Sequence, residues 1–145
     1  MLEIYEGALP TYEIYQKWEL QAKNRNFGAF CVFTGIVREE KQIEGLSFDI
    51  YKPLLDKWFC HWEEKAAHQE VVLMMAHSVG DVKNAQSSYM SATMSSHRKI
   101  ALAIYEDFIE DFKHNAPIWK YDLKDGKRIY AIDRSHHLNG SGILS

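Results

Sequence analysis

Residues 96–132 read SHRKIALAIYEDFIEDFKHNAPIWKYDLKDGKRIYAI. The first half predicts a helix that begins at Ser96, because Ile100, Ile104 and Phe108 recur at helical spacing. Pro117 has no N–H to donate, so it ends any helical continuation. The two apolar segments that follow then predict a hairpin, with strands at 118–123 and 128–132 around the turn residues 124–127.

The chain before this stretch mixes helical and extended patterns. Residues 27–37, FGAFCVFTGIV, form a continuous run of aromatic and β-branched residues and predict a buried strand. We expect helices at 11–23 and 53–68, and further strands at 46–51, 71–76 and 88–94. Because regular βαβ alternation is missing, the sequence predicts an α+β domain with a mixed or antiparallel sheet and about three helices.

Length and composition fit one domain of ordinary type. The chain has 145 residues, of which 46% are apolar and 26% charged. We expect a domain over residues 1–134 and a loose C-terminal tail, SHHLNGSGILS, over 135–145. The net charge of −3 offers no reason to expect nucleic acid as a partner, so any anion site must be a local basic pocket.

Several features predict a cytosolic location. Cys31 and Cys60 form no CxxC and fall inside apolar patterns, which is typical of buried free thiols in a reducing compartment. No stretch approaches the length of a membrane span, and the N-terminus lacks the pattern of a signal peptide. We therefore expect no membrane partner.

Basic residues gather at structural breaks in the last third of the chain. His97 and Arg98 fall at the start of the predicted helix, where unpaired N–H groups and the helix dipole favour anions. The same dipole disfavours a cation in the first turn, so Arg98 fits this position if an anion lies between its side chain and the helix end. The alternative is that Arg98 points to solvent, and for an isolated arginine that alternative is the better one.

Lys113 and Lys120 flank Pro117. Lys113 suits the negative end of the helix dipole, which alone is sufficient to explain it. Lys120 is flanked by large apolar residues, and two ammonium groups in one pocket would lower each other's pKa, so that one could act as a base. Arg38 offers a planar fork for phosphate or carboxylate, or else an ion pair with Glu39 or Glu40.

Familiar catalytic and metal motifs are missing from the sequence. There is no GxSxG, no GxxxxGK[ST] and no HExxH, and His61, His68 and His77 have no metal-ligand spacing with a cysteine. We therefore expect no metal and no bound cofactor. Composition and spacing lead to an α+β domain with a candidate anion pocket, and they do not give the reaction type.

Four blocks carry a resemblance to a known family. Residues 28–38, GAFCVFTGIVR, are similar to G-A-x-x-x-F-T-G-x-V-R, and 113–120 are similar to K-x-x-x-P-[IF]-W-K. Residues 96–98 resemble an S-x-H-R segment, and 77–80 an H-x-I-G element. In this order and spacing, the blocks resemble the large subunit of molybdopterin synthase over roughly residues 28–134.

The resemblance implies an α+β sulphurtransferase subunit that forms a homodimer. Each copy would bind one small ubiquitin-like sulphur-carrier subunit, giving a heterotetramer. The carrier's C-terminal Gly-Gly thiocarboxylate would enter a pocket of the large subunit. There its sulphur would pass to cyclic pyranopterin monophosphate, and two transfers would form the dithiolene of molybdopterin for molybdenum cofactor biosynthesis.

The resemblance also implies roles for individual positions. Lys120 and Lys113 match the two catalytic pocket lysines; we expect Lys120 to be the principal acid/base and Lys113 to hold the thiocarboxylate. The matching substrate-binding positions are Ile36, Val37, Arg38, His97, Arg98 and Arg134, the last contributed by the neighbouring large subunit.

The chain departs from the family pattern in two places. Tyr121 and Asp122 stand where the family usually has a basic residue and Glu; we keep both as substrate-binding candidates. The segment 82–88 lacks the glycine commonly found before the next strand. A non-catalytic adaptor that docks an acidic C-terminal tail remains the alternative, and turnover with a thiocarboxylated carrier would distinguish the two.

Overall fold

The computed structural model describes residues 1–131 and confirms an α+β fold. Arg134 and the tail expected at 135–145 lie outside the described residues. No helix within residues 1–131 combines the length and apolarity needed to cross a membrane. The elements, in chain order, are β1 (Leu2–Glu6), α1 (Thr11–Asn24), β2 (Ala29–Ile36), β3 (Gly45–Ile50), α2 (Lys52–His68), β4 (Val72–Lys83), β5 (Ser87–Ser95), α3 (Arg98–Asn115), β6 (Ile118–Lys124) and β7 (Lys127–Tyr130).

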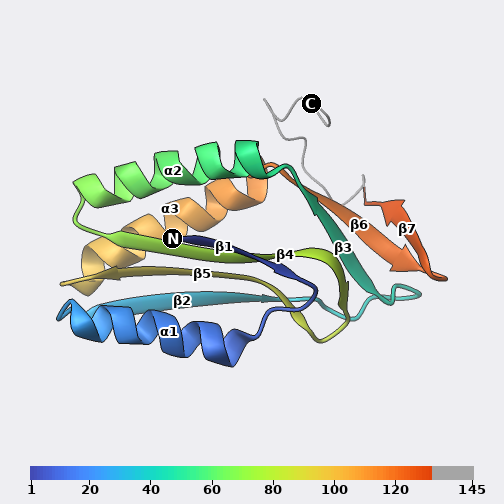
Figure 1. The fold of residues 1–145 in the computed structure, drawn as a ribbon, viewed down its shortest axis with the longest axis horizontal. Coiled ribbons are helices and arrows are strands. Elements are labelled where there is room, and N and C mark those ends of the chain that lie inside the picture. Colours follow the sequence, from blue (N-terminus) through green and yellow to red (C-terminus); the bar gives the residue numbers. More distant parts are fainter. Residues whose placement is uncertain (132–145) are drawn as a thin grey trace.

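One mixed sheet forms the centre of the molecule (Figure 1). Its strand order is β2-β5-β4-β3-β6-β7, with β1 beside β4 as the parallel pair. The long strand β4 changes neighbours along its length: residues 72–77 pair with β5, 75–79 with β1 and 80–83 with β3. Gly80 lies at this change of partner with φ +81°, a backbone conformation that glycine adopts without steric cost.

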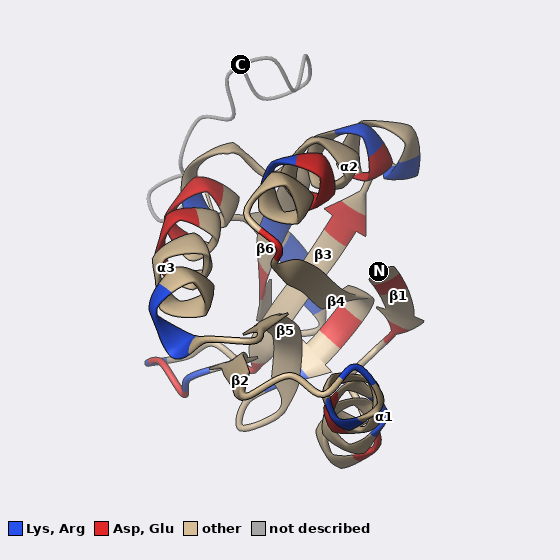
Figure 2. Cartoon of the chain, turned by 90° about the vertical axis from the view of Figure 1, so that its left-hand side faces the viewer, with Lys and Arg blue, Asp and Glu red and all other residues tan. Residues whose placement is uncertain are grey.

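Helices cover both faces of the sheet. Helix α1 lies on one side, and α2 with α3 on the other (Figures 1 and 2). Side chains of β4 alternate between the two layers, as a strand buried on both faces requires. Leu73 and Met75 pack in the cluster under α2 and α3, whereas Met74 and Ala76 pack in the cluster under α1.

The run at 27–37 was expected to be a buried strand, but this burial is wrong: β2 is an edge strand in which only Ala29 is buried. Two other extended segments were not predicted in full. The apolar run at 71–76 marks only the first half of β4, because Asp81 and Lys83 are exposed and only Val82 between them is buried. Strand β1 was not predicted, because it is five residues long and has no continuous apolar run. Helix α3 begins at Arg98, with His97 as its extended N-cap residue, two residues after the expected start.

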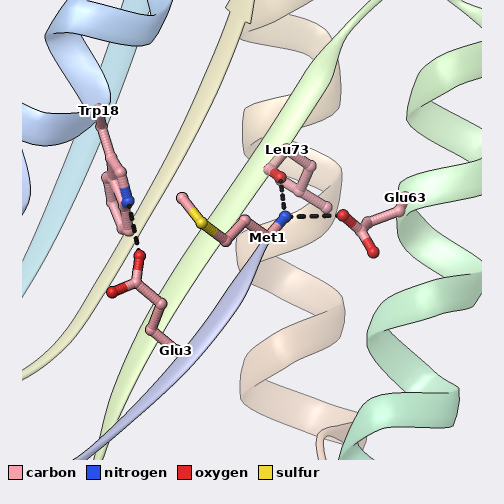
Figure 3. A network of polar contacts seen from close by, with 5 residues as sticks. All are labelled: Met1, Glu3, Trp18, Glu63 and Leu73. Carbon is pink, nitrogen blue, oxygen red and sulfur yellow. Dashed lines mark hydrogen bonds and ion pairs between the residues drawn. The ribbon is translucent and has the colours of Figure 1, made fainter.

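Polar contacts hold the short strand β1 to both helical layers (Figure 3). The Met1 ammonium group donates to Glu63 on α2 at 2.6 Å and to the Leu73 carbonyl at 3.0 Å. The Trp18 indole N–H of α1 donates to Glu3 at 3.4 Å. Strand β1 is therefore held by side chains as well as by its ladder to β4.

A single carboxylate joins α2 to α3. The indole N–H groups of Trp58 and Trp62 both donate to Asp111 Oδ2, at 2.9 and 2.7 Å, and Asn115 donates to Oδ1 at 2.6 Å. Partial burial raises the pKa of the Asp111 carboxyl, but these three hydrogen bonds outweigh burial and leave the pKa below its ordinary value. The carboxylate thus satisfies two indoles of α2.

We expect Asp111→Ala to lower the free energy of unfolding by about 2–3 kcal/mol, because two partly buried indole N–H groups would lose a charged acceptor. Urea denaturation measures this difference. Asp107→Ala, at an exposed position of the same helix, is the control and should change stability by less than about 0.5 kcal/mol. Equal effects of the two substitutions would contradict the role of Asp111.

His77 lies in the core of the sheet. Its side chain is buried and contacts the rings of Phe48, Tyr89 and Phe112. Nδ1 is 2.7 Å from the Ser78 carbonyl oxygen, which can only accept, so Nδ1 carries the proton. Burial lowers the pKa of His77 from 6.5 to about 4, although the contact with the carbonyl opposes that shift.

The folded protein should therefore lose stability as the pH falls from 6.5 towards 4. The unfolded chain takes up a proton on His77 first, so this group lowers the free energy of unfolding by up to about 3 kcal/mol across that interval. His77→Asn keeps a donor for Ser78 and should remove this part of the slope. His61→Asn, at an exposed position, should leave the slope intact. Parallel curves of unfolding free energy against pH for the wild type and both variants would refute the role of His77.

Candidate functional site

A cavity of about 200 Å³ lies where the ends of β2 and β5 approach β3 and β6. It unites residues that are far apart in the sequence, including four of the predicted site positions. We call it the Arg38–Lys120 pocket. Its lining residues are Gly35, Ile36, Val37, Arg38, Glu40, Ile43, Leu46, Ser88 and Lys120.

An irregularity in the sheet shapes one wall of the pocket. The β2–β5 register shifts between Gly35 and Ile36, which is a β-bulge of the kind that redirects side chains next to functional sites. A Cβ atom on Gly35 would lie 3.2 Å from the Tyr89 Cβ, so glycine allows the two strands to approach here. Beyond the bulge Ile36 is 60% exposed, whereas Val37 is buried.

The sheet register positions Lys120. On β6 it lies directly opposite Phe48 of β3. Phe48 is buried in a small cluster with Val37 and Val82, and Val37 also lines the pocket. The Lys120 carbonyl accepts from the Ala131 N–H at 3.2 Å, and the residue is half-buried. The ammonium group therefore comes from a strand paired on both sides rather than from a loop.

Arg38 lies at the mouth of the pocket. Its side chain is 85% exposed, and its guanidinium is 3.7 Å from the Glu40 carboxylate. The simple alternative of an ion pair with Glu40 is thus confirmed, and both partners line the pocket. With Lys120, the lining carries two cations and one carboxylate, a suitable environment for an anionic ligand.

Lys113 lies at the same end of the molecule but does not line the cavity. It is exposed in the last turn of α3. Its neighbour Phe112 stacks on Tyr89 with ring centroids 4.1 Å apart, and Tyr89 is paired with Gly35. The residue next to Lys113 thus packs on the strand pair that carries Gly35, whereas Lys113 itself is not part of the lining.

The start of α3, where His97 and Arg98 stand, lies at the opposite end of the sheet (Figure 1). Ala29, at the start of β2, pairs with Ser95, whereas Ile36, at its end, pairs with Ser87. Strand β2 has eight residues, so at about 3.3 Å per residue the two ends are roughly 25 Å apart. Figure 2 shows basic residues at the start of α3 and acidic ones along its later turns. Within one chain, these two residues do not meet Lys120.

Tyr121 and Asp122 are also absent from the pocket lining. Successive strand residues point to opposite faces, so Tyr121 faces away from the side of Lys120. The Arg128 guanidinium lies 4.0 Å from the centroid of the Tyr121 ring. Burial raises the pKa of the Tyr121 phenol, and a hydrogen bond to Asp49 raises it further. The ring belongs to a polar cluster with Arg128 and Asp49.

Sequence reasoning overlooked five residues of the pocket or considered them only in other roles. Glu40 was considered only as an ion-pair partner of Arg38. Its place two residues after Arg38 could have marked it as a pocket residue. The remaining four are Gly35, Ile43, Leu46 and Ser88, and their types and positions give no chemical signal. Within residues 1–131, no group of three or more His, Cys, Asp or Glu side chains could hold a metal ion.

Comparisons with known proteins identify the family. The model of the family described as MoaE protein matches residues 10–115. The molybdopterin synthase catalytic subunit of Helicobacter pylori (strain ATCC 700392 / 26695) is 59% identical over 145 residues, all of both chains.

Two solved structures have the same fold. One is a protein–protein complex of subunits 1 and 2 of molybdopterin-converting factor from Helicobacter pylori 26695, with a TM-score of 0.94, 59% identity and 99% of each chain covered. The other, a crystal structure of molybdopterin synthase from Staphylococcus aureus, has a TM-score of 0.74 and 28% identity, and the match covers 88% of this chain and 94% of that one. The family match, the full-length identity and the shared fold together establish that the chain belongs to the MoaE protein family.

Proposed function

We propose that this chain is the catalytic subunit of molybdopterin synthase. It takes sulphur from the C-terminal thiocarboxylate of a small ubiquitin-like carrier and transfers it to cyclic pyranopterin monophosphate, and two transfers form the dithiolene. One observation carries the proposal: in a chain of the MoaE protein family, Arg38 and Lys120 line one pocket although they come from distant parts of the sequence.

The pocket charges suit a reaction between two anions. The carrier end is negatively charged and the pterin carries a phosphate, so bringing them together is costly unless fixed cations offset their repulsion. Arg38 provides a permanent positive charge with a planar fork. Lys120 can also donate or accept a proton, which the ring opening and water loss of the pterin intermediate require.

The size of the pocket also fits the proposed donor. A cavity of about 200 Å³ is small for a whole pterin together with a side-chain-bearing peptide. A Gly-Gly end has no side chains and can bring its terminal group past Ile36, which is 60% exposed at the pocket. Lys113, which is exposed and not part of the lining, would then meet the tail outside the reacting centre.

We infer that His97 and Arg98 act at the site of a second copy of the chain. They match the family's anion-binding set, but in their own chain they lie at the far end of the sheet. A homodimer can bring the far end of one copy to the pocket of its partner. Exposed apolar side chains, including Phe33 and Leu102, support association with other chains.

A cytoplasmic location completes the proposal. The cysteines Cys31 and Cys60 are free, as in a reducing compartment, but neither is buried as expected: Cys31 is half-buried and Cys60 is exposed. A metal or resident cofactor is not needed for the proposed chemistry, because the cations that offset the substrate charges are side chains.

Lys120→Ala should lower the rate of sulphur transfer by about 10²–10⁴-fold, because the reaction would lose its principal general acid or base. Carrier binding should survive better, since Arg38 remains. Lys120→Arg keeps the charge but cannot deprotonate usefully, so it should be nearly as slow as the alanine variant. The measurement is single-turnover conversion of the pterin precursor with saturating thiocarboxylated carrier.

Circular dichroism of each variant serves as the control for folding. A folded Lys120→Ala protein with near wild-type turnover would remove Lys120 from the mechanism. High activity of Lys120→Arg would reduce its role to an electrostatic anchor. Failure of the wild-type chain to convert the precursor, with carrier binding intact, would favour the non-catalytic adaptor.

Sharing of sites between copies can be tested by complementation. A doubly tagged heterodimer of one Lys120→Ala copy and one Arg98→Ala copy should have one doubly damaged and one intact site, hence about half of wild-type activity. The matched control pairs Lys120→Ala with Arg38→Ala. Both of these positions lie in the same pocket, so each site of that heterodimer is damaged and no recovery is expected. Equal inactivity of the two heterodimers would exclude a shared site.

A further inference from the structure

We propose that Glu40 sets the anion affinity of the Arg38–Lys120 pocket by acting as an internal carboxylate that an incoming anion must displace. The nature of that anion, a chain-terminal carboxylate or thiocarboxylate, rests on the proposed function. The displacement itself rests on the geometry of Arg38 and Glu40 alone.

The first support is the position of the carboxylate. Glu40 lies 3.7 Å from the Arg38 guanidinium, and both residues line the same cavity as Lys120. An oxyanion bound to the Arg38 fork would occupy the region that this carboxylate now reaches. While the pair is formed, the positive charge offered to a ligand is partly neutralised.

The second support is that the backbone of Glu40 is held while its side chain is not deeply buried. The Ile43 N–H donates to the Glu40 carbonyl at 3.1 Å, and the two residues form an isolated β-bridge. Gln42 in this turn has φ +64°, as a tight turn requires. The Glu40 side chain remains 35% exposed, so an incoming anion can reach the carboxylate beside Arg38.

The third support is a second position for the carboxylate. Glu40 and Ile43 also line a neighbouring groove of about 680 Å³. Lys124 lines that groove and can receive the displaced carboxylate, whereas Glu39, Glu44 and Asp125 make it unattractive to a negatively charged ligand. Glu40 thus lines both the Arg38–Lys120 pocket, which suits an anion, and the neighbouring groove, whose carboxylates repel one.

The energetics favour easy exchange. Exposed ion pairs contribute little to stability, so an anion with better geometry can replace Glu40 at small cost. A bidentate contact of a carboxylate or phosphate with the Arg38 fork is such a geometry, and 3.7 Å is long for a charge-assisted hydrogen bond. The ligand class is therefore an oxyanion. Glu40 lowers the affinity for every oxyanion that must displace it, and only a well-placed one still binds.

Glu40→Gln tests the proposal, with Glu39→Gln as a control that changes the net charge equally. Glu39 lines the neighbouring groove but not the pocket. The probes are a synthetic peptide ending in Gly-Gly with a free carboxylate, and inorganic phosphate, titrated by calorimetry at constant ionic strength. We expect Glu40→Gln to lower the Kd of the peptide about three- to tenfold, and Glu39→Gln to change that Kd by less than about twofold.

The outcomes separate the two sources of the oxyanion. Tighter peptide binding identifies a chain terminus as the ligand that Glu40 opposes, and tighter phosphate binding alone assigns the effect to the phosphorylated substrate. Unchanged binding of both probes, or an equal gain in Glu39→Gln, would overturn the proposal. In an Arg38→Gln background the gain from Glu40→Gln should vanish, and its persistence would also overturn the proposal.

Steady-state turnover provides a readout that a merely structural role would not move. Glu40→Gln should lower KM for the thiocarboxylated carrier while kcat does not rise; a higher KM would count against the proposal. Because the peptide titration needs no turnover, it can succeed in a chain that transfers no sulphur, which would refute the proposed function alone. Active wild-type protein with unchanged Glu40→Gln binding would refute this inference alone.

Discussion

The change of partner along β4 is the constraint on which the rest of the molecule depends. Its first half pairs with β5 and with β1, and its second half pairs with β3 beyond the positive φ of Gly80. The first half anchors the core between the helical layers, since its side chains alternate between both faces. The second half carries β3, and β3 in turn aligns β6 so that Lys120 lies opposite Phe48. Without that register the lysine would not reach the end of β2.

The pocket combines rigid and movable parts. Val37 of its lining belongs to a buried apolar cluster and its lysine lies on a paired strand, so neither shifts easily when a ligand enters. Its arginine and glutamate are more exposed, and their ion pair is long. Such a division lets the site hold a reacting group in place while the charge at its mouth adjusts to the arriving anion. Because Arg38 is exposed and the ion pair is long, the pair contributes little to folding.

Much of the fold was predictable, for identifiable reasons. Helices α2 and α3, strand β2 and the β6–β7 hairpin carry strong periodicity or turn signals, and all four lie close to their expected bounds. The missed parts are half-exposed strands, β1 and the end of β4, whose residues gain extended structure from neighbours rather than from their own pattern. Ala85, with φ +69°, occupies the β4–β5 turn where a glycine would have given a clear signal.

The sequence by itself determined the α+β class, the family resemblance and the chemical types at the site, because these depend on local pattern and on the residues themselves. Only the tertiary structure decided which of those residues meet. Strand pairing brings Lys120 to Arg38 across most of the chain, and the length of β2 separates both from Arg98, although all three belong to one family pattern. Tyr121 follows Lys120 directly yet faces the other side, because neighbouring side chains on a strand alternate. Distances of this kind are set by long-range register, which no local pattern records.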